Sequence, residues 1–186
     1  RLIPARKSRK WRKKLILTGN KITEEVLNGK IVIEPFDPAA VTTNSYDLTL
    51  GDKLVMYTDE VLDPKKEPHT RTFEIPDEGY EMKRGEFLLG CSNEFVGSDF
   101  YVPIVHAKSS IARLGLFIHI TSGLFDIGCK CNVTFHLYAT MPVRLYKNMP
   151  IAQITFWKTA GEIRLYHGKY QNDKGPVASR IYKDFK

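Results

Sequence analysis

The sequence contains no run of about 20 consecutive apolar residues, the length that a membrane-spanning helix needs. Its N-terminus is basic but lacks the apolar core of a secretory signal. Only three cysteines occur, which are too few for a disulfide framework and fit a reducing compartment. These absences predict a cytoplasmic protein whose fold depends on neither a membrane nor disulfide bonds.

Two of the cysteines, Cys129 and Cys131, lie two residues apart, a spacing that puts side chains on one face of a strand. A zinc site would need more soft ligands, at C-x-x-C type spacing. We interpret the cysteines as buried or simply reduced thiols.

The formal net charge of +7 is concentrated in residues 1–14, which contain eight Lys and Arg residues and no acid. The remaining chain carries 20 basic and 21 acidic residues, so its body is not basic. We predict an extension over residues 1–17 and one domain over residues 18–186. The extension could bind nucleic acid through its charge and Trp11, or pack as a solvated arm on protein. The second use is favoured, because nothing else resembles a nucleic-acid module.

The rest of the chain alternates short apolar runs with Gly and Pro, a pattern typical of strands and turns. Only residues 21–28 and 109–115 have helical character. The expected strands cover residues 31–33, 46–50, 53–57, 72–75, 87–91, 101–105, 117–121, 133–138, 143–146 and 151–156. This pattern predicts a mainly β fold with short helices, an antiparallel sandwich or barrel of the jelly-roll kind.

Residues 109–115 have the character of an anion site. Ser109 and Ser110 begin a short helix, whose free N–H groups and dipole attract phosphate. Arg113 lies four residues after Ser109 and shares its helix face, and Lys108 adds a charge just before the helix. Taken alone, these residues are better explained by a helix cap and a surface arginine than by an anion site.

Motifs along the whole chain decide between these interpretations. In their order and residues they resemble the superfamily of dCTP deaminases and dUTPases. The matching segments are Lys108–Leu116, His119–Ser122, Asp126–Gly128, Asn44–Gly51, Tyr146–Gln153 and Lys169–Ile181.

The resemblance implies a distorted jelly-roll, dUTPase-like β-barrel that forms a homotrimer. It further implies nucleotide sites between subunits and Mg2+ carried by the triphosphate of a pyrimidine deoxynucleotide. It places the residues of the site in three groups. The phosphate residues are Lys108, Ser109, Ser110 and Arg113, joined by Tyr166 and Lys169; the base and sugar residues are Ser122, Phe125 and Thr134; and the catalytic positions are Asp126 and His136. Asp173 stands where the family has Gln.

His136 occupies the position at which dCTP deaminases carry the Glu that transfers protons. Histidine also moves protons near neutral pH, but its ring is bulkier and places its nitrogens differently. Leu124 and Ser122 also depart from the Arg and Ala of the family. His136 could instead be a packing residue on the interior face with Thr134 and Tyr138, and we expect a structural role for His119.

These departures lead us to expect a hydrolase that converts dUTP, or a related pyrimidine nucleotide, to the monophosphate and pyrophosphate. Asp126 would activate the attacking water, and the hairpin over residues 123–134 would read the base. One alternative is a dCTP deaminase in which His136 or another group replaces the Glu. Another is a nucleotide-binding regulator without turnover that meets its partner through the basic extension.

Overall fold

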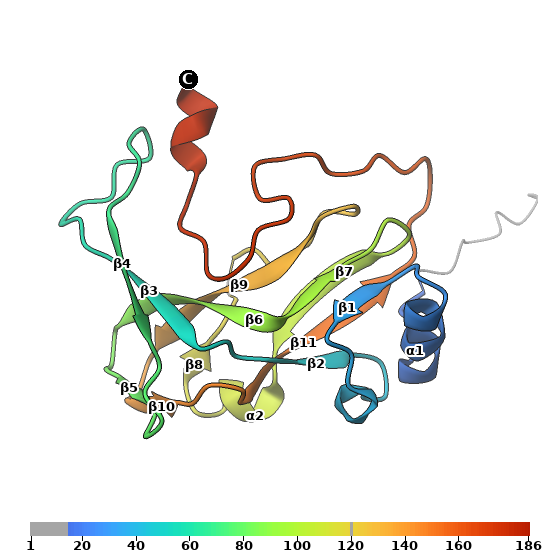
Figure 1. Cartoon of the computed structure of the whole chain (residues 1–186), viewed down its shortest axis with the longest axis horizontal. Helices are drawn as coiled ribbons and strands as arrows, with labels where there is room; N and C mark the ends of the chain where they lie inside the picture. Colours follow the sequence, from blue (N-terminus) through green and yellow to red (C-terminus); the bar gives the residue numbers. More distant parts are fainter. Residues whose placement is uncertain (1–14, 120) are drawn as a thin grey trace, which may run out of the picture.

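The computed structural model describes residues 15–119 and 121–186, which form β-strands with a few short helices (Figure 1). The basic residues 1–14 lie outside the described residues, and so does their proposed contact with nucleic acid or protein. Ile16 pairs with Trp157, and Leu17 is buried, so this part of the chain packs on the domain. Among the described residues, no helix is long and apolar enough to cross a membrane.

The strands follow one another along almost the whole described chain. They are β1 Val32–Glu34, β2 Tyr46–Thr49, β3 Lys53–Tyr57, β4 Thr70–Glu74, β5 Tyr80–Met82, β6 Phe87–Gly97, β7 Val102–Ala107, β8 Leu116–Phe117, β9 Lys130–Ala139, β10 Val143–Leu145 and β11 Pro150–Trp157. The α-helices are α1 Gly19–Leu27 and α2 Ser109–Ala112. The predicted mainly β fold with short helices is confirmed.

Three antiparallel sheets build the domain. The largest has the order β4-β3-β6-β9-β8, with β1 also paired to β6. The second has the order β2-β11-β7, and β5 pairs with β10 in the third. In Figure 1, β9 and β6 run side by side through the middle of the molecule, and the C-terminal segment passes over them.

The central strand β9 follows the period of two that a half-buried strand requires. Val133, Phe135, Leu137 and Ala139 are fully buried in the core, whereas Thr134 and His136 are half-buried on the other face. The interior packing role considered for His136 beside Thr134 and Tyr138 is therefore wrong, because these side chains face away from the core.

The structure departs from the sequence expectations mainly in strand lengths. Strand β5 was not expected, because its three residues are too few to show alternation. The strand expected over residues 117–121 ends at Phe117. Helix α1 ends as expected before Gly29, whose φ of +69° lies in the left-handed region that favours glycine.

Replacing the buried Phe135 by Ala tests the assignment of the two faces of β9. Phe135 has no exposed surface, so Phe135→Ala should lower the free energy of unfolding by about 3–5 kcal/mol, the usual cost of a large core cavity. Urea denaturation measures the change. Phe100→Ala is the matched control, because half of the Phe100 side chain is already exposed. A loss for Phe135→Ala as small as that of the control would contradict the assignment.

Candidate active site

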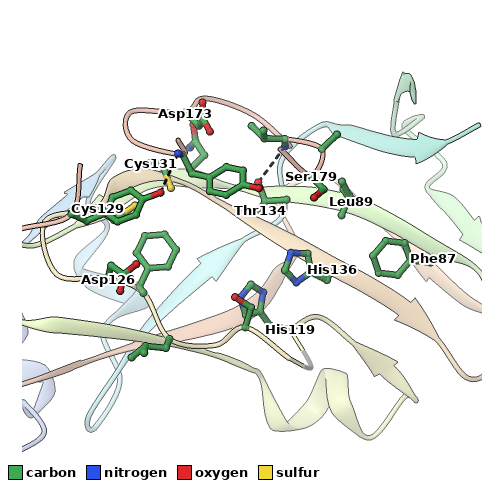
Figure 2. Close-up of a pocket in the computed structure, with 18 of the residues that line it drawn as sticks. Phe87, Leu89, His119, Asp126, Cys129, Cys131, Thr134, His136, Asp173 and Ser179 are labelled. Atoms are coloured by element: carbon green, nitrogen blue, oxygen red, sulfur yellow. Dashed lines mark hydrogen bonds between the residues drawn. The ribbon is translucent and has the colours of Figure 1, made fainter. Parts of the chain in front are cut away.

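A cavity of about 680 Å3 lies on the half-buried face of β9, beneath the C-terminal segment. Its walls come from five regions of the chain: strand β3 with Leu62 in the following loop, strand β6, lining residues between His119 and Cys129, strand β9, and residues 166–179. Figure 2 shows the labelled side chains, with Asp126 at one end of the cavity and Phe87 at the other.

The structure brings six of the predicted site residues together around this cavity. They are Ser122, Phe125, Asp126, Thr134, His136 and Tyr166. They include both predicted catalytic residues and all three predicted base and sugar residues. The grouping agrees with the resemblance, although the roles of the individual residues stay predictions.

The remaining phosphate residues do not line the cavity. Lys108 forms an ion pair with Asp47, which also accepts a hydrogen bond of 3.0 Å from Gln153 Nε2. Arg113 Nη1 donates to Ser109 Oγ at 3.3 Å across one turn, so helix α2 forms as predicted. Ser109, Ser110 and Arg113 are exposed.

Lys169 also lies off the cavity, in an ion pair with Asp184. The predicted phosphate residues therefore do not form one site within a single chain.

Asp126 is held at the cavity by a tight turn. Its carbonyl accepts a hydrogen bond of 3.0 Å from Cys129 N, and Gly128 N donates to Ser98 O at 2.7 Å. Gly128 has a φ of +90°, and a Cβ there would lie 2.9 Å from Tyr166 N, so only glycine fits this turn against the C-terminal segment. The Asp126 side chain is exposed and makes no hydrogen bond or ion pair within the described chain. Its carboxylate can therefore accept a bond from water or a ligand.

His136 lies near the middle of the cavity, where its ring stacks on that of His119. The ring centroids are 4.7 Å apart and the planes differ by 10°. The backbone fixes this pair, since His136 N donates to Ile118 O at 2.9 Å. His119 was expected to be structural, but it lines the cavity beside His136 (Figure 2).

Burial keeps both imidazoles neutral at physiological pH. It lowers the pKa of His136 below its usual range. Burial, reinforced by the nearby His136, lowers the pKa of His119 to about 4. The Nδ1 atom of His119 is buried and has no hydrogen-bond partner among the described residues. Neutral imidazole carries one nitrogen that accepts a proton, so the cavity contains a proton acceptor other than a carboxylate.

The C-terminal segment closes the cavity by hydrogen bonds to β9 and β3. Val177 N donates to Thr134 Oγ1 at 3.2 Å, and Ser179 N donates to Tyr57 Oη at 3.0 Å. Asp173 accepts two bonds from Arg180, at 2.8 and 3.0 Å. This forked pair holds the segment in a loop, so Asp173 has a structural partner at the position where the family carries Gln.

Several cavity residues were not predicted from the sequence. Asn132 could have been found, because it shares the β9 face of Thr134 and His136 by simple alternation. Tyr170 carried no such signal, since it reaches the cavity only through the fold of the C-terminal segment. Asp173 had been noted only as the residue at the family's Gln position. Cys129 and Cys131, which we interpreted as buried or reduced, are buried but also line the cavity.

Within the described ranges, no group of three or more His, Cys, Asp or Glu side chains is arranged to hold a metal ion. The expected Mg2+ thus has no ligand cage made by the protein alone. This agrees with the way Mg2+ is often bound, mainly through substrate phosphates and water.

Comparison with known proteins identifies relatives over nearly the whole chain. A family model described as dCTP deaminase-like matches residues 16–159. A "dCTP deaminase, dUMP-forming" from Clostridium beijerinckii is 41% identical over 172 residues, which cover 92% of this chain and 99% of the relative. A protein of the same name from Leptospira biflexa is also 41% identical, over 92% of this chain and 98% of its own.

The crystal structure of 2'-deoxycytidine 5'-triphosphate deaminase from Agrobacterium tumefaciens has a similar fold, with a TM-score of 0.63. It is 18% identical and aligns with 80% of this chain and 49% of its own. This likeness supports the predicted dUTPase-like fold.

These findings correct the expectation of a dUTP hydrolase, because the relatives are named for deamination of dCTP. The expectation assumed that loss of the Glu at His136 removes deamination. It weighed histidine as a proton carrier but judged its ring unsuited to this position, whereas the half-buried, neutral His136 is available there as a proton acceptor. The alternative of a dCTP deaminase fits the relatives better, and the chain belongs to the dCTP deaminase-like family.

Proposed function

We propose that this protein deaminates dCTP and releases dUMP, as the names of its relatives describe for them. The observation that carries the proposal is the presence of two different proton acceptors in one cavity, the exposed carboxylate of Asp126 and the neutral imidazole of His136. The overall reaction consumes dCTP and two water molecules and yields dUMP, pyrophosphate and ammonia. Each water molecule needs a group that takes its proton.

His136 is the acceptor for the deamination step. Water attacks C4 of cytosine while His136 takes one of its protons and returns that proton to the amine, which leaves as ammonia. The second proton of the water moves to N3 as the C4 carbonyl of uracil forms. The buried position of His136 suits this role, because a neutral imidazole is available at physiological pH. His119 supports the ring of His136 by stacking on it.

Asp126 is the proton acceptor for the step that releases pyrophosphate. Its carboxylate orients the water that attacks the α-phosphorus, and pyrophosphate is the leaving group. The tight turn at Gly128 fixes the backbone of Asp126, and the exposed side chain leaves room for water. Phe125, Ser122 and Thr134 surround the same space and supply an apolar surface and two hydroxyl groups for base and sugar.

Mg2+ would supply charge neutralisation on the triphosphate. The described residues form no metal cage. We therefore assign no Mg2+ ligand among them and no step of the reaction to the metal.

A homotrimer with shared sites explains why the phosphate residues lie outside the cavity of their own chain. Ser109, Ser110 and Arg113 are exposed, as a surface that meets the triphosphate in a neighbouring subunit would be. Each site would then combine the cavity of one subunit with helix α2 of another.

The purified protein should release ammonia, pyrophosphate and dUMP from dCTP in equal amounts. His136→Phe should lower ammonia release by about 10²–10⁴-fold, the usual contribution of a general acid–base group. His136→Glu should retain release, because a carboxylate can carry the same proton. His69→Phe is the matched control, since His69 is an exposed histidine that pairs with Asp59 and does not line the cavity. Pyrophosphate without ammonia, with dCMP as product, would refute the proposal.

The pH dependence follows from the lowered pKa of His136. The general base must be neutral, so kcat/KM should stay constant as the pH falls to about 6.5, the usual value for histidine, and decline only below it. His136→Glu should change the pH at which kcat/KM declines. A decline centred above pH 6.5 would contradict a neutral His136 base.

Stability should be measured in parallel by urea denaturation, because both buried histidines bind protons more readily in the unfolded chain. Their stabilising contribution is complete above about pH 6.5 and is lost as the pH falls toward about 4 through the folded pKa of His119. Rates are compared only where the folded fraction is unchanged.

Mixing two inactive variants tests the shared site. Asp126→Asn removes the cavity's carboxylate, and Arg113→Ala removes a phosphate residue on α2. Each variant alone should form little dUMP. Unfolding and refolding them together should restore about a quarter of the wild-type dUMP formation, because random assembly puts both intact halves in about a quarter of the sites. Sedimentation of the wild type should give three times 21.3 kDa. If the mixed variants form trimers but regain no activity, all residues of a site must come from one chain.

A further inference from the structure

Two thiols line the same end of the cavity as Asp126. Cys129 and Cys131 are only 7% and 6% exposed, yet both contribute to the cavity wall. The two thiols interact, since each shifts the pKa of the other. Figure 2 shows them together near Asp126 and Asp173, at a distance from His136. Neither cysteine belongs to the hydrophobic core cluster, which includes the next residues of the β9 core face.

A bond between these two sulfurs needs the turn at Cys129 to move. Residues two apart in a strand have Cα atoms about 6.5 Å apart, but their parallel side chains keep the Cβ atoms beyond the roughly 3.5–4.5 Å of a disulfide. Cys129 lies at the turn, where its N–H bonds to Asp126 O at 3.0 Å, and β9 begins at the next residue. The turn can adjust more easily than the middle of the strand, so a small movement of Cys129 suffices.

The surroundings make Cys129 the more reactive of the pair. The hydrogen bond from Cys131 lowers the pKa of the Cys129 thiol, against the opposing effects of burial and of the negative charge of Asp126. The pKa of Cys131 is raised by the same hydrogen bond and by burial. Cys91 differs from both, since burial raises its pKa to about 12 and it does not line the cavity. Thiolate character favours attack on an oxidant.

We propose that Cys129 and Cys131 are a site of reversible oxidation, at which a peroxide forms an intramolecular disulfide that stops turnover at the adjacent Asp126. Cys129 attacks the peroxide, its O–O bond breaks, and a sulfenic acid and one water molecule form. The sulfur of Cys131 then displaces a second water molecule and closes the disulfide. Two thiols lose two electrons and two protons in total, and the peroxide is reduced to water. A small dithiol reverses the reaction by exchange.

The disulfide would disturb two contacts that define the cavity. Movement of Cys129 changes the turn that holds Asp126, through the hydrogen bond from Cys129 N to Asp126 O. Movement of Cys131 changes its neighbour Asn132, whose N–H donates to Asp173 O at 3.0 Å and thereby holds the C-terminal segment. Formation of the disulfide needs no assumption about activity, whereas its inhibitory effect rests on the proposed function.

A tryptic map detects the disulfide directly, because Lys130 lies between the two cysteines. In reduced and alkylated protein, cleavage after Arg113, Lys130 and Arg144 releases residues 114–130 and 131–144 as separate peptides. After treatment of the full chain with hydrogen peroxide, these two segments should remain joined in one species until a reductant is added. Cys91→Ser should give the same joined species, and Cys129→Ser should not. Separate alkylated or over-oxidised peptides after peroxide would overturn the proposal.

Turnover of dCTP measured on the same samples tests the consequence. Peroxide should lower the activity of the wild type and Cys91→Ser at least tenfold, in proportion to the joined species, and a dithiol should restore it. The remaining activity of Cys131→Ser should not respond in this way. Full activity of a completely joined sample would overturn the inhibitory role. Absence of turnover before oxidation would instead count against the proposed function, and the peptide map would still decide whether the disulfide forms.

Discussion

The alternation of β9 is the constraint on which the cavity depends. The residues from Val133 to Ala139 that enter the core are fully buried, so a shift of the register by one residue would bring His136 into the core and expose Phe135. The core therefore fixes which side chains face the cavity. Strand β9 pairs with β6 along one edge and with the short β8 along the other, and these pairings fix its position within the sheet. The side chains on the polar face of β9 can then be held in fixed positions without many polar contacts of their own.

The same burial that stabilises β9 sets the chemistry of its polar face. A fully exposed histidine would be partly protonated near neutral pH, whereas His136 is kept neutral by its partial burial. Stacking on His119 strengthens this effect in the pair, because two adjacent imidazolium ions would repel each other. Burial would instead raise the pKa of a carboxyl group at this position toward neutral pH, where it too can take and return a proton. Histidine is thus a base suited to this half-buried place.

Much of the fold and part of the site could be predicted from the sequence. Gly- and Pro-bounded apolar runs located most strands, and the motif from Lys108 to Leu116 correctly indicated the family and the short helix. The separation of that motif from the cavity could not be predicted, because it depends on which sheet carries each segment. Likewise His119 has no local pattern that distinguishes a cavity residue from a structural one. Its position follows from the contact between Ile118 and the backbone of His136, far along the chain.

The reaction was the least predictable property, since it depends on the state of one side chain rather than on its type. Alignment of the motifs showed that His136 replaces a Glu, and the replacement was taken as a loss of function. The fold changes that inference, because the environment of His136 favours the neutral ring and supplies a wall of Leu89, Phe125 and His119 around it. The effect of a substitution at a position such as His136 therefore has to be judged together with the burial and neighbours that determine its protonation.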